Sequence, residues 1–193
     1  MWWARLLNVI SGLLAGGVAA STNSYESIST VTVGAGGASS VVFSSIPSTF
    51  KHLQIRYIAR GTASTSSNLD LEMYFNTDTT QSANYRQHRL IGTGAAVSSD
   101  TYSGYITPGR IATTGALTNN FAVSVCDILD YTNTNKNKVI RALSGLDNND
   151  TTGLIFFDSG VWLNTAAIST ITLTQSTYNI SQYSQFALYG IKG

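Results

Sequence analysis

The side chains that could carry nucleophilic or acid–base chemistry are few in this sequence and lie far apart. It contains two histidines, His52 and His88, and one cysteine, Cys126. Covalent catalysis needs a nucleophile, a base and an orienting group that converge, and neither histidine stands in a known catalytic signature. A zinc site would need more His or Cys at ligand spacing. We therefore expect no enzyme of this kind, no metal centre and no cofactor.

The carboxylates suggest two weaker hypotheses. Asp147 and Asp150 bracket a polar loop and could supply oxygen ligands to calcium, but turns capped by their own Asx side chains are the simpler expectation. Asp70 and Glu72 share one face of an expected strand and could form the carboxylate pair of a glycan depolymerase. Such a pair also needs a cleft and a defined separation, which the sequence does not show, so this hypothesis ranks last.

Charge argues against nucleic acid as a partner. Only 11% of the residues are charged and the net charge is +1, whereas roughly 25% are charged in a typical soluble domain. Lys and Arg form no run, and electrostatic binding to nucleic acid needs a clustered basic footprint. A surface rich in hydroxyl and amide groups is instead typical of viral shells, fibres and extracellular adhesins.

Tyrosines near polar stretches are candidate contacts with a partner protein or with a host surface glycan. A tyrosine offers a large rigid face with one polar tip, which suits both kinds of ligand. The candidates are Tyr74, Tyr85, Tyr102, Tyr105, Tyr178 and Tyr183.

The first twenty residues, MWWARLLNVISGLLAGGVAA, are apolar apart from Arg5 and a few small polar residues. This pattern is that of a bacterial secretory signal, and about 20 residues could also cross a bilayer. We favour a third interpretation, an anchor that stays in the mature chain. Free apolar termini are ordered only when docked, so copies of the same segment or a larger assembly would hold it.

The spacing of the apolar residues predicts that this anchor is a helix packed against other helices. Its glycines weaken an isolated helix by roughly 1 kcal/mol each, so neighbouring chains must stabilise it, and a homotrimer is the arrangement we expect. We assign residues 1–24 to a helical anchor and linker. The anchoring side chains are Trp2, Trp3, Leu6, Leu7, Ile10, Leu13 and Leu14.

From residue 25 to 193 the pattern changes to a period of two, which predicts an all-β domain of about ten antiparallel strands. We expect a jelly-roll-like β-sandwich. Residues 52–60, HLQIRYIAR, and residues 69–75, LDLEMYF, give the clearest alternation. In the second, the odd-numbered residues should be buried and the even-numbered ones exposed. The glycine-rich stretch 34–37 should form a hairpin turn.

Several blocks of the body resemble a recurrent group of proteins from tailed bacteriophages and from marine or freshwater viruses. They are YESISTVTVG, FSSIPSTFKHLQIRYIAR, DILDYTNTNKNKVIRALSG, WLNTAAISTITLT and YSQFALYGIKG. That group consists mostly of uncharacterised virion components, and the resemblance covers residues 25–193. It brings no catalytic motif, so no functional residue can be carried over.

The resemblance implies a structural protein located in the virion. We expect an outward-facing sandwich, attached by its leading helix to other virion proteins of the capsid or tail as a decoration protein or fibre. The alternative is a carbohydrate-binding tip or adhesin that recognises a host receptor. A glycan depolymerase is the least favoured alternative.

Overall fold

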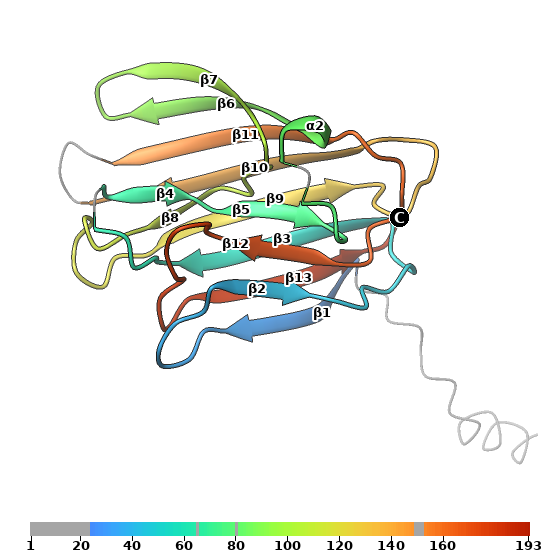
Figure 1. The fold of residues 1–193 in the computed structure, drawn as a ribbon, viewed down its shortest axis with the longest axis horizontal. Helices are drawn as coiled ribbons and strands as arrows, with labels where there is room; N and C mark the ends of the chain where they lie inside the picture. The colour runs from blue at the N-terminus through green and yellow to red at the C-terminus, as the bar shows by residue number, and fades with distance from the viewer. Residues whose placement is uncertain (1–23, 65, 80, 149–152) are drawn as a thin grey trace, which may run out of the picture.

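The computed structural model describes residues 24–64, 66–79, 81–148 and 153–193, which form a two-layered antiparallel β-sandwich (Figure 1). One layer is an eight-stranded sheet with the order β1-β13-β3-β9-β10-β11-β6-β7. The other consists of a three-stranded sheet, β2-β12-β5, and a two-stranded sheet, β4-β8. The predicted all-β sandwich is therefore confirmed. The expected helical anchor, from Trp2 to Leu14, lies outside the described residues.

The elements follow one another in chain order as short strands joined by turns. They are β1 (Tyr25–Thr32), β2 (Ser40–Phe43), β3 (His52–Ala59), β4 (Asn68–Asp70), β5 (Glu72–Phe75), α2 (Gln81–Asn84), β6 (Tyr85–Thr93), β7 (Val97–Ser103), β8 (Arg110–Ala112), β9 (Ala122–Leu129), β10 (Lys138–Leu146), β11 (Leu154–Trp162), β12 (Ile171–Thr174) and β13 (Gln185–Ile191). Within the described residues, no helix is long and apolar enough to cross a membrane.

Strand β3 follows the predicted alternation. Leu53, Ile55 and Ala59 are fully buried between the layers, and Tyr57 is nearly so, whereas Arg56 and Ile58 lie on the outer face of the sheet. The core that these residues join is built around a large aromatic group in which Trp162 packs against Tyr85 and Phe75. The apolar side chains between the layers thus supply the main driving force for folding.

The prediction for residues 69–75 was wrong in two respects. The stretch is two strands in different sheets, broken at Leu71, and all four residues of β5 are buried. The two polar residues of β5 tolerate burial because the Tyr74 hydroxyl donates a hydrogen bond of 2.9 Å to the Glu72 carboxylate. Because these two polar side chains satisfy each other, they can be buried, and the polar residues of β5 do not mark an exposed face.

The glycine-rich stretch 34–37 forms a turn, as expected, but it does not join a hairpin. It carries the chain from β1 in the eight-stranded sheet to β2 in the three-stranded sheet. Gly37 has a φ of +77°, and a Cβ there would lie 2.7 Å from the Ile180 carbonyl oxygen, so the position requires glycine. The turn is one of the places where the chain changes layer.

Candidate functional site

The outer face of the eight-stranded sheet carries a large group of exposed apolar side chains. At one end of the strands, a row of residues crosses six neighbouring strands, and we call it the glycine row: Ile58, Val123, Gly145, Ile155, Gly92 and Val97. The adjacent row consists of Val125, Leu143, Phe157 and Leu90, and we call it the aliphatic row after its three aliphatic members. Together the two rows form the apolar face.

The side chains of the apolar face are exposed to an unusual degree. The exposed fraction runs from 42% for Val125 to 73% for Val97, and Ile155 reaches 62%. Monomeric proteins seldom expose contiguous apolar patches larger than a few hundred Å², and larger patches mark interaction sites. The apolar face is therefore the strongest candidate for a functional surface among the described residues.

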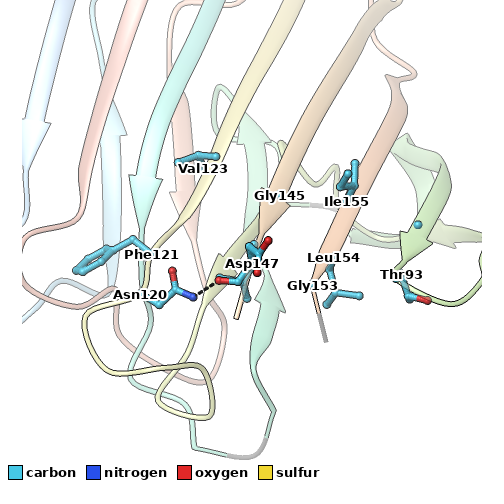
Figure 2. A pocket seen from close by; sticks show the side chains of 12 residues that line it. Thr93, Asn120, Phe121, Val123, Gly145, Asp147, Gly153, Leu154 and Ile155 are labelled. Atoms are coloured by element: carbon cyan, nitrogen blue, oxygen red, sulfur yellow. Dashed lines mark hydrogen bonds between the residues drawn. The ribbon is translucent and has the colours of Figure 1, made fainter. Parts of the chain in front are cut away.

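A shallow hollow of about 670 Å³ opens on the glycine row. Figure 2 shows Val123 and Ile155 on either side of Gly145, with Asn120 and Asp147 near the end of the strands. The Asn120 side-chain amide donates a hydrogen bond to the backbone carbonyl of Asp147, which ties the two loops together. Because the lining is mainly apolar and open, the hollow suits a side chain of another protein better than a charged ligand.

Next to the aliphatic row lies a row that we call the polar row, and its charges are already paired. It consists of Gln54, Asp127, Arg141, Ser159 and His88. Gln54 donates a hydrogen bond of 2.7 Å to the Asp127 carboxylate, and Arg141 contacts the other oxygen of Asp127 at 3.1 Å. Arg56 in turn donates to the Gln54 side chain at 2.7 Å. Another surface could therefore cover this row without leaving the Asp127 carboxylate unpaired.

Between the layers lies a cluster of charged residues that the sequence did not indicate, and we call it the Arg89 cluster. The Arg89 guanidinium contacts Asp158 at 2.7 Å and Asp70 at 3.1 Å, and Asp70 also contacts Arg110 at 2.8 Å. Gln87 donates a second hydrogen bond of 2.7 Å to Asp158. Burial raises the pKa of Asp158 to about 6, while the neighbouring carboxylates raise the pKa of Arg89 despite its burial.

The expectation that Asp70 and Glu72 share one strand face, as the depolymerase hypothesis supposed, was wrong. They belong to strands of different sheets, so they do not share one strand face. The Asp70 carboxylate is held by Arg89 and Arg110, whereas Glu72 is buried and accepts the Tyr74 hydroxyl. Both carboxylates thus have structural partners that explain their positions.

The six candidate tyrosines fall into three pairs. Tyr74 and Tyr85 are buried in the core, so the expectation that they contact a ligand was wrong. Tyr183 is 71% exposed in a loop, and Tyr178 is half-buried. The remaining two, Tyr102 and Tyr105, pack on each other with ring centroids 4.5 Å apart, and the Tyr105 hydroxyl donates to Asp70 at 3.2 Å.

The other residues considered for chemistry have ordinary surroundings. The His52 ring accepts a hydrogen bond of 3.0 Å from the backbone N–H of Asp130, and Cys126 is buried, which raises the pKa of its thiol. Asp147 borders the hollow, and Asp150 lies outside the described residues. Across the part of the chain that the structure describes, no three His, Cys, Asp or Glu side chains group as metal ligands.

The sequence does contain an indication of the apolar face, namely strands with apolar residues in both alternating positions. In β9, the outward residues Val123 and Val125 are at least as apolar as the inward residues Ala122, Ser124 and Cys126. In β11 the inward Asp158 is polar, while the outward Phe157 is apolar. Strands that are apolar on both faces are expected where both faces become covered.

Comparison with known proteins adds little to this geometry. No protein-family model and no curated protein matches the sequence. Among solved structures, a protein of unknown function from Bacteroides ovatus is similar over 69% of this chain with 11% identity and a TM-score of 0.21, and the match spans 46% of that protein. The exoplasmic/lumenal domain of VIP36, in a Ca²⁺/Man3GlcNAc-bound form, is similar over 88% of this chain and 84% of its own, with 8% identity and a TM-score of 0.26. Neither likeness is close enough to carry an argument about function.

Proposed function

We propose that this chain is a non-enzymatic structural protein of a bacteriophage particle, attached to the capsid or tail with its sandwich domain facing outward. The observation that carries the proposal is the apolar face, whose eight large side chains are each at least 42% exposed. Leaving such a surface in water is unfavourable, by roughly 25 cal/mol for each Å² of apolar area. The face is therefore a surface built for covering by protein, as in an assembly.

Three further features support a particle component. The net charge of +1 and the small share of charged residues give the body little long-range field. Residues 25–193 resemble virion components of tailed bacteriophages. The apolar segment 1–20 supplies a means of attachment, with Trp2 and Trp3 as its largest side chains.

Deleting residues 1–20 tests this function. We expect the shortened chain to disappear from purified particles, because several large apolar side chains would each contribute roughly 1.5–3 kcal/mol to attachment. The measurement is quantitative mass spectrometry of particles assembled with the full or the shortened chain. A double substitution on the smaller layer, Val42→Thr with Thr172→Ser, is the control and should leave incorporation unchanged. Full incorporation of the shortened chain would refute the anchor.

Copy number then separates a decoration protein from a fibre or tip. A decoration protein should be present in hundreds of copies and stabilise the shell, whereas a tip should be present in few. Antibody against a tip should also block adsorption to the host.

A second candidate function, carbohydrate binding, is favoured by the Tyr102–Tyr105 pair. Tyr102 is 44% exposed, and Asp100 on the same strand is also exposed, so an aromatic surface lies beside a carboxylate acceptor. Sugars stack on such rings and donate hydroxyl hydrogens to such carboxylates.

Tyr102→Ala tests the carbohydrate function. If a glycan array finds a ligand, this substitution should weaken its binding about tenfold, the equivalent of about 1.4 kcal/mol. Tyr183→Ala serves as the matched control, because Tyr183 is exposed elsewhere on the molecule. Absence of any ligand, or equal effects of the two substitutions, would exclude this role for the pair.

A further inference from the structure

We propose that the apolar face packs against the same face of a second copy of this chain, about a twofold axis that runs parallel to the strands above the gap between β10 and β11. The inference rests on the proposed function and names one partner in the assembly, a second copy of this chain. This pairing concerns the sandwich domains and is separate from the trimer expected of the N-terminal segments. The evidence for it is the order of the side chains along the glycine row and the aliphatic row. A symmetric interface must be complementary to itself, and these rows have that property.

The glycine row divides equally at the proposed axis. Ile58, Val123 and Gly145 lie on one side, in β3, β9 and β10, and Ile155, Gly92 and Val97 lie on the other, in β11, β6 and β7. The rotation sets Gly145 opposite Ile155, Val123 opposite Gly92, and Ile58 opposite Val97. Each glycine thus faces a branched side chain of the other copy, which can enter the space that the glycine leaves.

That space is not filled by the chain itself. A Cβ at Gly145 would meet no atom closer than the Leu154 carbonyl oxygen at 3.6 Å, and one at Gly92 would meet only the Ile155 carbonyl oxygen at 4.0 Å. Facing sheets pack about 10 Å apart with interdigitated side chains. The space at each glycine of one copy can therefore receive a protruding side chain from the glycine row of the other copy.

The same axis pairs the neighbouring rows favourably. In the aliphatic row it sets Leu143 opposite Phe157 and Val125 opposite Leu90. In the polar row it sets the Asp127 carboxylate opposite the imidazole of His88, and Arg141 opposite Ser159. No like charges meet in these rows, so charge repulsion does not oppose this arrangement.

Moving the axis by one strand in either direction weakens the match. Above the gap between β11 and β6, both glycines would still face branched side chains, but Val123 and Ile58 would face no strand, because β7 is the edge of the sheet. Above the gap between β9 and β10, Ile155 would face Ile58, and the Gly92 site would face the polar Gln185. In the same arrangement Arg56 would face Phe157 of the other copy. Of these three positions, the one between β10 and β11 sets all eight large apolar side chains opposite apolar residues or glycines.

The area is close to what a stable pair requires. Six strands about 4.8 Å apart and about seven residues long present on the order of 600 Å² of flat sheet. Protruding side chains make the accessible area larger than that of a flat sheet, and bring it toward the roughly 800 Å² that each partner buries in stable complexes. The net charge of +1 adds little repulsion between two copies.

Two full-length variants, Ile58→Cys and Val97→Cys, test the pairing. Both native side chains are exposed, and the natural Cys126 is buried, so the introduced thiols are the reactive ones of the described part of the chain. The axis brings residue 58 of one copy opposite residue 97 of the other, whereas two copies of either position lie far apart. A bis-maleimide with a two-carbon spacer should therefore link an equimolar mixture into covalent dimers, and should link neither variant alone. A Val42→Cys variant, on the other layer, is the control partner.

We expect the mixed product to exceed each single-variant product at least tenfold, and Leu143→Lys in both chains to reduce it by a similar factor. Circular dichroism of the lysine variants checks that they fold. Equal yields from the mixture and the single variants would overturn the pairing. The pairing would also be overturned if the chains were monomeric and the introduced thiols did not react with a monofunctional maleimide. Residues 1–20 would then be the segment that covers the face. Cross-linking by a chain that never enters particles would support the pairing and refute the proposed function.

Discussion

Replacing Arg89 with methionine should lower the free energy of unfolding by about 3–5 kcal/mol, the cost expected when one partner of a buried ion pair is removed. The Arg89 side chain is 4% exposed and contacts Asp158, which is fully buried, and Asp70. Without the guanidinium, both carboxylates lose their shared cation between the two layers, and Asp158 would have to take up a proton. Urea denaturation, followed by tryptophan fluorescence, measures the change.

Arg141→Met is the matched control for this prediction. Arg141 also contacts an aspartate, Asp127, at 3.1 Å, but its side chain is 62% exposed on the outer face. Exposed ion pairs contribute about 0–1 kcal/mol, so the control should remain near wild-type stability. Equal losses from the two substitutions would contradict a structural role for the Arg89 cluster.

Gly109→Ala should destabilise the fold by about 3 kcal/mol or more, through backbone strain and overpacking together. Gly109 has a φ of +125°, and a Cβ there would lie 2.6 Å from Ser144 Cβ and 2.8 Å from the Tyr57 hydroxyl. The segment is pressed against the inner face of the eight-stranded sheet, where Ser124 donates a hydrogen bond to the Pro108 carbonyl. A methyl group would push this segment away.

Gly34→Ala provides the comparison for the second prediction. A Cβ at Gly34 would have no neighbour within 4 Å, and its φ lies outside the left-handed region. Thermal unfolding of the two variants should show a large fall in Tm for Gly109→Ala and little change for Gly34→Ala. A Gly109→Ala protein as stable as wild type would show that segment 108–110 does not hold the layers together.

The fold class was predictable because apolar alternation dominates most strands. In β3 the inward residues are all apolar or aromatic, so a period of two is unmistakable. The break at Leu71 was not predictable from the same pattern, since β4 and β5 continue one alternating run yet pair with β8 and β12 in different sheets. Which strands pair is a property of the whole chain and not of a local window.

The candidate surface was harder to foresee, because polar and apolar residues exchange their usual places. In β6 the inward residues include Gln87 and Arg89, while Leu90 points outward and is 50% exposed. Each face of this strand carries both polar and apolar residues, so the local pattern alone does not show which face is buried. Only the partners in space, Asp158 and Asp70 around Arg89, explain why the charge lies inside.

Buried contacts hold the sandwich together, and we propose that a second copy of the chain covers its apolar face. The Arg89 cluster and Gly109 hold the two layers in register, which keeps the eight-stranded sheet in one shape. That sheet in turn presents the glycine row and the aliphatic row at fixed spacing. A rigid, weakly charged sandwich of this kind is suited to repeated, symmetric placement in a particle.

A cryo-electron microscopy map of the proposed phage particle, at a resolution that shows side chains, tests the account most directly. The account predicts density for this sandwich in which Ile155 and Leu143 are covered by protein, and in which Trp2 and Trp3 are enclosed by other polypeptides. Density in which the apolar face is surrounded by solvent and the two tryptophans touch no other chain would contradict it.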